Sequence, residues 1–145
     1  MRYQEFVELV SRDGGLKLDK AAAIVEVALE TLSERISKTN RENLAAQLPK
    51  ELKDLVFKRR ETDRYSLEEF YDRIRAQANI TRPHAVLRAR TVMRALQQAV
   101  SPGELKEIVS ELPAEYDELF GKEPASPLSP SYLTTKEQKH LQSSI

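Results

Sequence analysis

The sequence predicts an all-α protein in which two tandem four-helix repeats pack as one pseudo-two-fold helical bundle, followed by a C-terminal tail rich in Pro and Ser. Two observations support this. The chain repeats its pattern after 64 residues without an insertion, so that Leu48-Pro49 returns as Leu112-Pro113. Apolar residues within each repeat recur every three or four positions, which is the spacing of one helical face. A repeat this short buries that face against its copy, so we expect one shared core.

The first helix of each repeat has an apolar face led by aromatic residues. Ser66 and Glu69 form a capping box at the start of this helix in repeat two. Gly15 ends the helix in repeat one, and Asn79 holds the matching position, since both residues adopt the left-handed conformation readily. The predicted inward residues are Tyr3, Phe6, Val7 and Val10 in repeat one, and Leu67, Phe70, Tyr71 and Ile74 in repeat two.

The second helix of each repeat is the longest. We expect Asp19 to cap it in repeat one and Thr81 to cap it in repeat two, where Pro83 lies in the first turn and loses no hydrogen bond. Its predicted inward residues are small or aliphatic: Ala21, Val25, Ala28, Leu29, Leu32 and Ile36 in repeat one, and Ala85, Ala89, Val92, Met93, Leu96 and Val100 in repeat two.

Two shorter helices close each repeat. Ser101 followed by Pro102 and Glu104 is a strong start signal for the third helix of repeat two, and Thr39 with Glu42 is its weaker version in repeat one. The Leu-Pro pairs then break the chain, because proline disfavours helix in the residue before it. The fourth helices carry Leu52, Leu55 and Val56 in repeat one and Tyr116, Leu119 and Phe120 in repeat two.

These elements divide the chain into four parts. Residues 1–57 form the first helical repeat, 58–64 a polar connector and 65–121 the second helical repeat. Residues 122–145 form a tail in which prolines alternate with serines, a composition that supports no packed core. We expect this tail to be disordered or to become ordered only when docked.

The composition excludes several classes of site. The sequence has no cysteine, which excludes disulfides and thiolate metal sites, and its four glycines form no phosphate-binding loop. Basic and acidic side chains balance at 23 each, so general attraction to nucleic acid is not expected. No apolar run is long enough to span a membrane, and the first residues do not resemble a signal peptide. We therefore expect a cytoplasmic protein.

The duplicated pattern of an aromatic-led helix, a long Ala/Leu helix and a closing Leu-Pro-x-Glu motif resembles the bacterial domain-of-unknown-function family 2267. The resemblance covers about Tyr3 to Phe120, and the tail lies outside it. Because its motifs are structural, the resemblance implies an all-helical, prokaryotic, cytosolic protein and carries over no catalytic or binding residue.

The two repeats differ most in charge. The stretch from Arg73 to Gly103 has six arginines and no acid, whereas the matching stretch of repeat one contains Glu26, Glu30 and Glu34. We favour a structural interpretation, in which Glu26 and Glu30 face Arg90 and Arg94 across the two-fold axis and fix the pairing of the repeats. The acids of the last helices are then the partners of Arg73 and Arg75.

The other interpretation is a binding surface. Arg75, Arg82 and Arg88 are its best candidates, because their matching positions in repeat one carry no acid. Arg88 stands out because it replaces the apolar Ile24. In the tail, Tyr132-Leu133 is an apolar pair that either binds a partner as a short linear motif or docks on the two-repeat body. We leave these two alternatives open.

We interpret the protein as a non-enzymatic helical module that binds a protein partner, with Arg75, Arg82, Arg88, Tyr132 and Leu133 as candidate partner-binding residues. The alternative is a weak nucleic-acid or polyanion binder that uses the arginine-rich helix of repeat two. It is disfavoured because no aromatic residues interleave with the arginines.

No catalytic, cofactor-binding or metal-binding residue is expected. The repeated acids Glu51 and Glu115 each follow a proline that opens a helix, where a carboxylate complements the helix dipole. His84 is expected at the surface.

Overall fold

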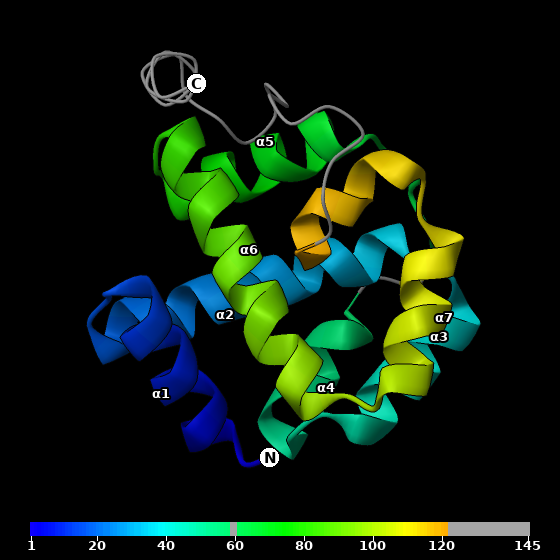
Figure 1. Cartoon of the computed structure of the whole chain (residues 1–145), viewed down its shortest axis with the longest axis horizontal. Coiled ribbons are helices and arrows are strands. Elements are labelled where there is room, and N and C mark those ends of the chain that lie inside the picture. The colour runs from blue at the N-terminus through cyan, green and yellow to red at the C-terminus, as the bar shows by residue number, and fades with distance from the viewer. Residues whose placement is uncertain (59–60, 122–145) are drawn as a thin grey trace, which may run out of the picture.

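The computed structural model describes residues 1–58 and 61–121, and all regular elements in these ranges are helical (Figure 1). Repeat one contains α1 (Tyr3–Gly14), α2 (Leu18–Arg35), α3 (Lys38–Gln47) and α4 (Lys50–Val56). Repeat two contains α5 (Leu67–Ala78), α6 (Arg82–Ala99), α7 (Pro102–Glu111) and the short 3-10 helix η1 (Ala114–Phe120). The prediction of an all-α fold is confirmed.

The internal duplication holds at every helix boundary. Each helix of repeat two begins and ends 64 positions after its counterpart in repeat one, from α1 and α5 through to α4 and η1. Only the last pair differs in type, because η1 is a 3-10 helix while α4 is an α-helix. With three residues per turn, η1 directs Tyr116 and Leu119 to the same side, and both are buried.

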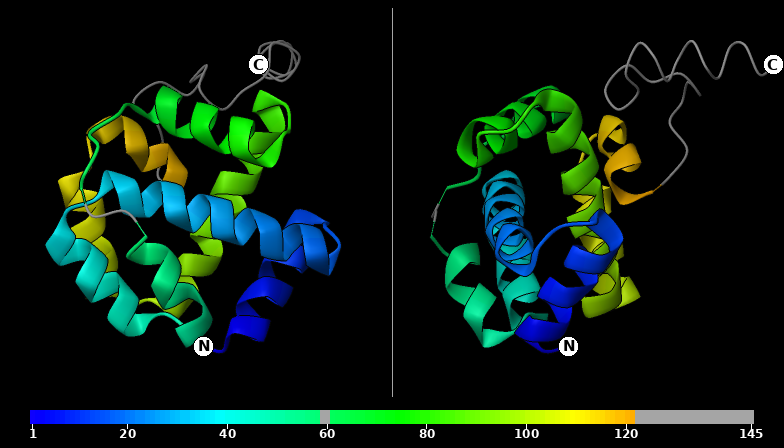
Figure 2. Two further views of the ribbon diagram at one scale, coloured as in Figure 1. Left: turned by 180° about the vertical axis from the view of Figure 1, so that it is seen from behind. Right: turned by 90° about the vertical axis from the view of Figure 1, so that its left-hand side faces the viewer.

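The two repeats interlock around a pseudo-two-fold axis. α1 packs on α2 of its own repeat and on α6 of the other, and α5 packs likewise on α6 and on α2. The long helices α2 and α6 cross in the middle of the molecule, and α3 lies beside α7 (Figure 1, Figure 2). The buried apolar residues of both repeats form one cluster, as predicted. Its fully buried members include Phe6, Leu29, Leu32, Phe70, Ile74 and Met93.

Three serines cap the helices of this bundle. The side chains of Ser66 and Ser101 accept hydrogen bonds from the backbone N–H groups of Glu69 and Glu104, each at 3.2 Å, as predicted. In α3 the cap is Ser37, which accepts from Asn40 N at 3.3 Å, so the assignment to Thr39 was wrong. The buried Ile36 ends α2 in an extended conformation, which places the next helix start directly after it.

The expected cap of α2 was also wrong. The N-cap position is Lys17, whose side chain makes no capping bond, and Asp19 lies inside the first turn. There its carboxylate still complements the helix dipole. In α6 the cap position is Thr81, as predicted, although its side chain accepts no capping hydrogen bond, and Pro83 lies in the first turn.

The helix ends follow the predicted chemistry. Gly15 and Asn79 are both in the left-handed conformation, with φ of 64° and 54°, and they end α1 and α5. Leu48 and Leu112 end α3 and α7, and the proline after each begins the approach to the next helix.

Candidate functional site

A hollow of about 440 Å³ lies where the turn between α5 and α6 packs against α2. The left-handed Asn79 reverses the chain there, and the N–H of Ile80 donates to the carbonyl of Arg75 at 3.2 Å. We call this feature the Arg88 hollow. It is lined by Lys20, Ala23, Ile24 and Val27 of α2, by Gln77, Ala78, Asn79 and Ile80, and by Arg88 of α6.

The Arg88 hollow combines an aliphatic lining with two cations. Ile24 is buried, Val27 and Ile80 are half-buried, Arg88 is half-buried and Lys20 is exposed. Within residues 1–58 and 61–121, neither Lys20 nor Arg88 forms an ion pair. Arg88 and its counterpart Ile24 therefore line the same cavity, one offering a charge and the other an apolar surface.

This arrangement suits a ligand that has a carboxylate next to an aliphatic group. A guanidinium presents two parallel N–H donors to a carboxylate, and such charge-assisted bonds are stronger than neutral ones. The aliphatic lining favours burial of the neighbouring apolar group.

The other two candidate arginines are held by nearby acids. Arg82 pairs with Glu68 at 2.7 Å and lies 3.8 Å from Asp72, while Arg75 lies 3.6 Å from Asp72. The Arg82 guanidinium also lies 5.6 Å from the centre of the Tyr71 ring. Exposed pairs of this kind contribute about 0–1 kcal/mol each. The structure thus brings Arg75 and Arg82 together with α5 acids and leaves Arg88 apart from them.

Arg73 joins three segments of the chain, and its predicted pairing with acids of the last helices was wrong. Its guanidinium contacts Glu34 at 3.1 Å, Asp63 at 2.8 Å and Glu69 at 3.1 Å. It also lies 3.9 Å from the centre of the Tyr65 ring. Burial alone would lower the pKa of Arg73, but the hydrogen bonds with Asp63 and Glu69 raise the pKa overall. The acids come from α2, the connector and α5, not from the last helices.

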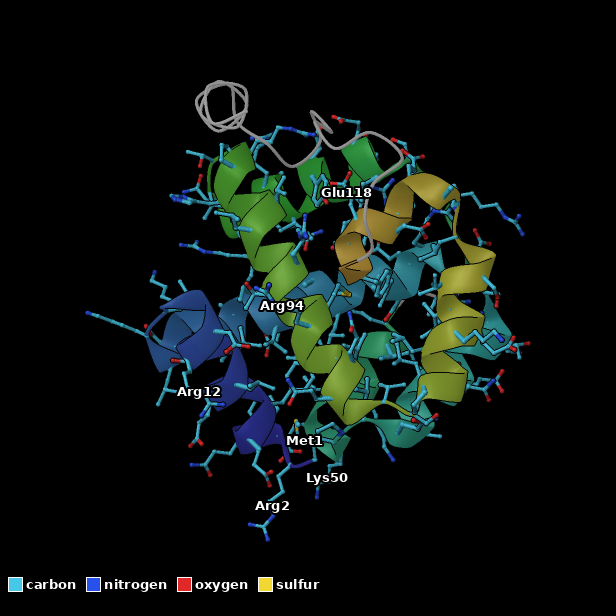
Figure 3. The ribbon with its side chains drawn as sticks, viewed as in Figure 1. Met1, Arg2, Arg12, Lys50, Arg94 and Glu118 are labelled. Atoms are coloured by element: carbon cyan, nitrogen blue, oxygen red, sulfur yellow. The ribbon has the colours of Figure 1, made fainter. Side chains whose placement is uncertain are left out.

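The predicted pairing of Glu26 and Glu30 with Arg90 and Arg94 was wrong. Glu30 pairs with Lys58 at 2.9 Å, and Glu26 is exposed and forms no ion pair with a described residue. Arg94 lies midway along α6, is exposed and reaches Thr91 Oγ1 at 3.5 Å (Figure 3). Because α2 and α6 cross instead of running side by side, matched positions away from the crossing point diverge.

The tyrosines of repeat two form a buried polar cluster with η1. The hydroxyl of Tyr71 donates to the buried carboxylate of Glu118 at 3.0 Å, and that of Tyr116 donates to the carbonyl of Tyr65 at 2.7 Å. Burial and the Glu118 carboxylate raise the pKa of Tyr71, and burial raises the pKa of Tyr116 to about 12. The predicted core positions of Tyr71 and Tyr116 are confirmed.

The remaining candidates lie away from the hollow. Tyr132 and Leu133 fall outside the described residues. Glu51 and Glu115 are exposed in the first turns of α4 and η1, and His84 is exposed in α6. In residues 1–58 and 61–121, no group of three or more His, Cys, Asp and Glu side chains is arranged to hold a metal ion. None of the helices in these ranges is both long and apolar enough to cross a membrane.

These observations define a class of protein: an all-helical bundle of two interlocked repeats. A hollow lined by two cations lies where the repeats meet. The chain belongs to the family of uncharacterized conserved proteins DUF2267, whose family model matches residues 3–119. This match confirms the resemblance found in the sequence and covers both repeats. Among curated proteins, none matches the chain.

Proposed function

We propose that this protein is a non-enzymatic helical module that binds another protein through the Arg88 hollow. The observation that carries the proposal is the position of Arg88, a half-buried cation beside the buried Ile24 with no ion-pair partner among the described residues. The proposal includes a bacterial, cytoplasmic setting and assigns the protein no catalytic role.

A peptide segment fits this hollow better than a nucleic acid does. An acidic residue next to an aliphatic one offers a carboxylate to Arg88 and Lys20 and an apolar group to Ile24 and Val27. A phosphate backbone offers charge without the apolar group, and nucleic-acid sites commonly add aromatic stacking. The pairing of Arg75 and Arg82 with Glu68 and Asp72 further weakens the alternative of an arginine-rich polyanion surface.

The test is selection of random peptides displayed on phage against the immobilised full-length protein. We expect enriched peptides to share an acidic residue adjacent to an aliphatic one. Arg88→Glu should lose these peptides, whereas Arg94→Glu, an equal charge change at an exposed position on the same helix, should retain them. Circular dichroism of both variants checks that they remain folded.

Two outcomes would count against the proposal. One is enrichment of peptides that bind Arg88→Glu as well as the unchanged protein. The other is binding to random single-stranded DNA and RNA that weakens steeply with salt and is lost in Arg88→Glu, which would favour the polyanion alternative.

A further inference from the structure

In repeat one, the chain that follows α4 folds back over the end of α2 and the start of α3. The hydroxyl of Thr62 donates to the carbonyl of Ile36 at 2.9 Å, and the N–H of Asp63 donates to the carbonyl of Glu34 at 2.8 Å. From α3, the buried Arg41 donates to Thr62 Oγ1 at 3.1 Å. Thr62 and Asp63 thus form a polar cover over this part of repeat one.

In repeat two, the corresponding surface contains an apolar groove of about 560 Å³ between the end of α6, α7 and η1. Leu105 holds the position of Arg41, and Val109 that of Ala45. The surface that is covered through a buried arginine in repeat one is therefore aliphatic in repeat two. We call it the α7 groove, and it is lined by Gln97, Pro102, Leu105, Lys106, Val109, Ser110 and Phe120.

The chain leaves the described part of the molecule beside this groove. Phe120 lines the groove, and its carbonyl accepts from the Gln97 side chain at 3.1 Å. The chain then turns at Gly121, whose φ is 80°, and 24 residues follow in the sequence. An extended chain spans about 3.3 Å per residue, so Leu128 reaches any point of the groove easily.

We propose that residues 122–130 of the same chain occupy the α7 groove, with Leu128 in contact with Leu105 and Val109. The 64-residue offset places Ser126-Pro127-Leu128-Ser129 where residues 62–65 lie in repeat one. In repeat one the polar Thr62 meets Arg41. In repeat two Leu105 holds the position of Arg41, and Leu128, two residues after the match of Thr62, is an aliphatic side chain suited to it. Proline restricts this segment before docking, which lowers the entropy that docking costs. This inference does not depend on the Arg88 hollow.

The lack of cysteine makes the proposal directly testable. In full-length protein, Ser129→Cys provides a single attachment point for a nitroxide spin label. We expect the label to broaden the NMR amide signals of Leu105, Lys106 and Val109. The signals of Lys20 and Ala23, which line the Arg88 hollow, serve as the reference and should keep their intensity.

Two further substitutions identify the contact. Adding Leu128→Asp to the labelled protein should restore the α7 signals, because a carboxylate would lose its hydration against the aliphatic Leu105 and Val109. Adding Leu133→Asp, an equal change further along the tail, should leave them broadened. If Leu133→Asp restores the signals and Leu128→Asp does not, the proposed contact is wrong.

A mixture of labelled, ¹⁴N protein with unlabelled, ¹⁵N protein separates docking within one chain from docking between chains. We expect no broadening in the mixture. Broadening there would assign the segment to a second copy and overturn the proposal, as would signals of α7 that stay sharp in the spin-labelled chain itself.

Discussion

Repeat one and repeat two have helices of equal length at matched positions, yet they treat polar groups in the interior differently. Repeat one buries Arg41, which donates to the carbonyls of Ser33 and Ile36 at 3.2 and 2.6 Å and holds the connector in place. Repeat two has Leu105 there, and its own buried polar contacts instead join Tyr71 and Tyr116 to Glu118 and Tyr65. The apolar pattern therefore fixes where the helices lie. The buried polar residues decide which contacts hold the last segment of each repeat, which is the connector in repeat one and η1 in repeat two.

The largest expected effect comes from giving repeat one the residue of repeat two at this position. Arg41→Leu removes the guanidinium that donates to the buried carbonyls of Ser33 and Ile36, and of these two only Ile36 also accepts from Thr62. We expect the free energy of unfolding to fall by about 2–4 kcal/mol, measured by urea denaturation. Arg12→Leu removes an exposed arginine and should change it by less than about 0.5 kcal/mol. If Arg41→Leu lowers the free energy of unfolding no more than Arg12→Leu does, the buried arginine does not hold the connector in place.

We expect the protein to lose stability at alkaline pH because of the buried tyrosines of repeat two. Burial raises the pKa of Tyr116 from 10.0 to about 12. The unfolded chain therefore releases this proton first, and the stability that is fully present below pH 10 is lost as pH rises toward 12. Tyr116 alone should contribute a slope of about 1.4 kcal/mol per pH unit in this window. Urea titrations between pH 9 and pH 11 should show a shallower slope for Tyr116→Phe, and an unchanged slope would contradict this assignment.

A smaller loss is expected at Arg73, whose counterpart in repeat one is the buried Leu9. Arg73→Leu makes the two repeats alike at this position, but it removes a cation that contacts the buried Glu34 and two more exposed pairs. We expect a loss of about 1–3 kcal/mol in thermal or urea unfolding, reduced because part of the pairing is open to solvent. Arg94→Leu is the matched exposed control. Equal unfolding curves for the two variants would rule out a junction role for Arg73.

The smallest expected changes in stability come from replacing the adjacent glycines Gly14 and Gly15, and the two changes have opposite signs. Repeat two has Ala78 where repeat one has Gly14, and a Cβ at Gly14 would lie 3.4 Å from Leu16 and 3.5 Å from Thr91, which is ordinary contact. Gly14→Ala should therefore stabilise the protein by roughly 0.5 kcal/mol. Gly15→Ala should destabilise it by roughly 1 kcal/mol, because φ at Gly15 is 64°. Calorimetry of the two variants should show melting temperatures that move in opposite directions.

The sequence predicted the helical framework well because its signals are local. Ser66, Ser101, Gly15 and Asn79 act through their own backbone neighbours, so their roles follow from spacing alone. The caps that were misplaced, Thr39 and Asp19, are acceptable cap residues near the true start. There the buried Ile36 or the turn after Gly15 set the boundary instead, and burial is not a local property.

The candidate site was only partly predictable. Arg88 was singled out because it replaces Ile24, but the hollow that both residues line arises only when the α5–α6 turn packs on α2. The pairing of Arg75 and Arg82 with acids of α5 was missed, although Asp72 precedes Arg75 by a favourable helical spacing of three. At the junction of Arg73 only the contact with Glu69, four residues earlier on α5, follows a helical spacing, whereas Glu34 and Asp63 come from other segments.

By itself, the sequence determined that this chain is a duplicated set of four helices with one shared apolar core, because periodicity, caps and proline breaks act over a few residues. Only the tertiary structure decided which charges meet and which face is hollow. Those contacts depend on the crossing of α2 and α6, and thus on packing between residues far apart in the chain.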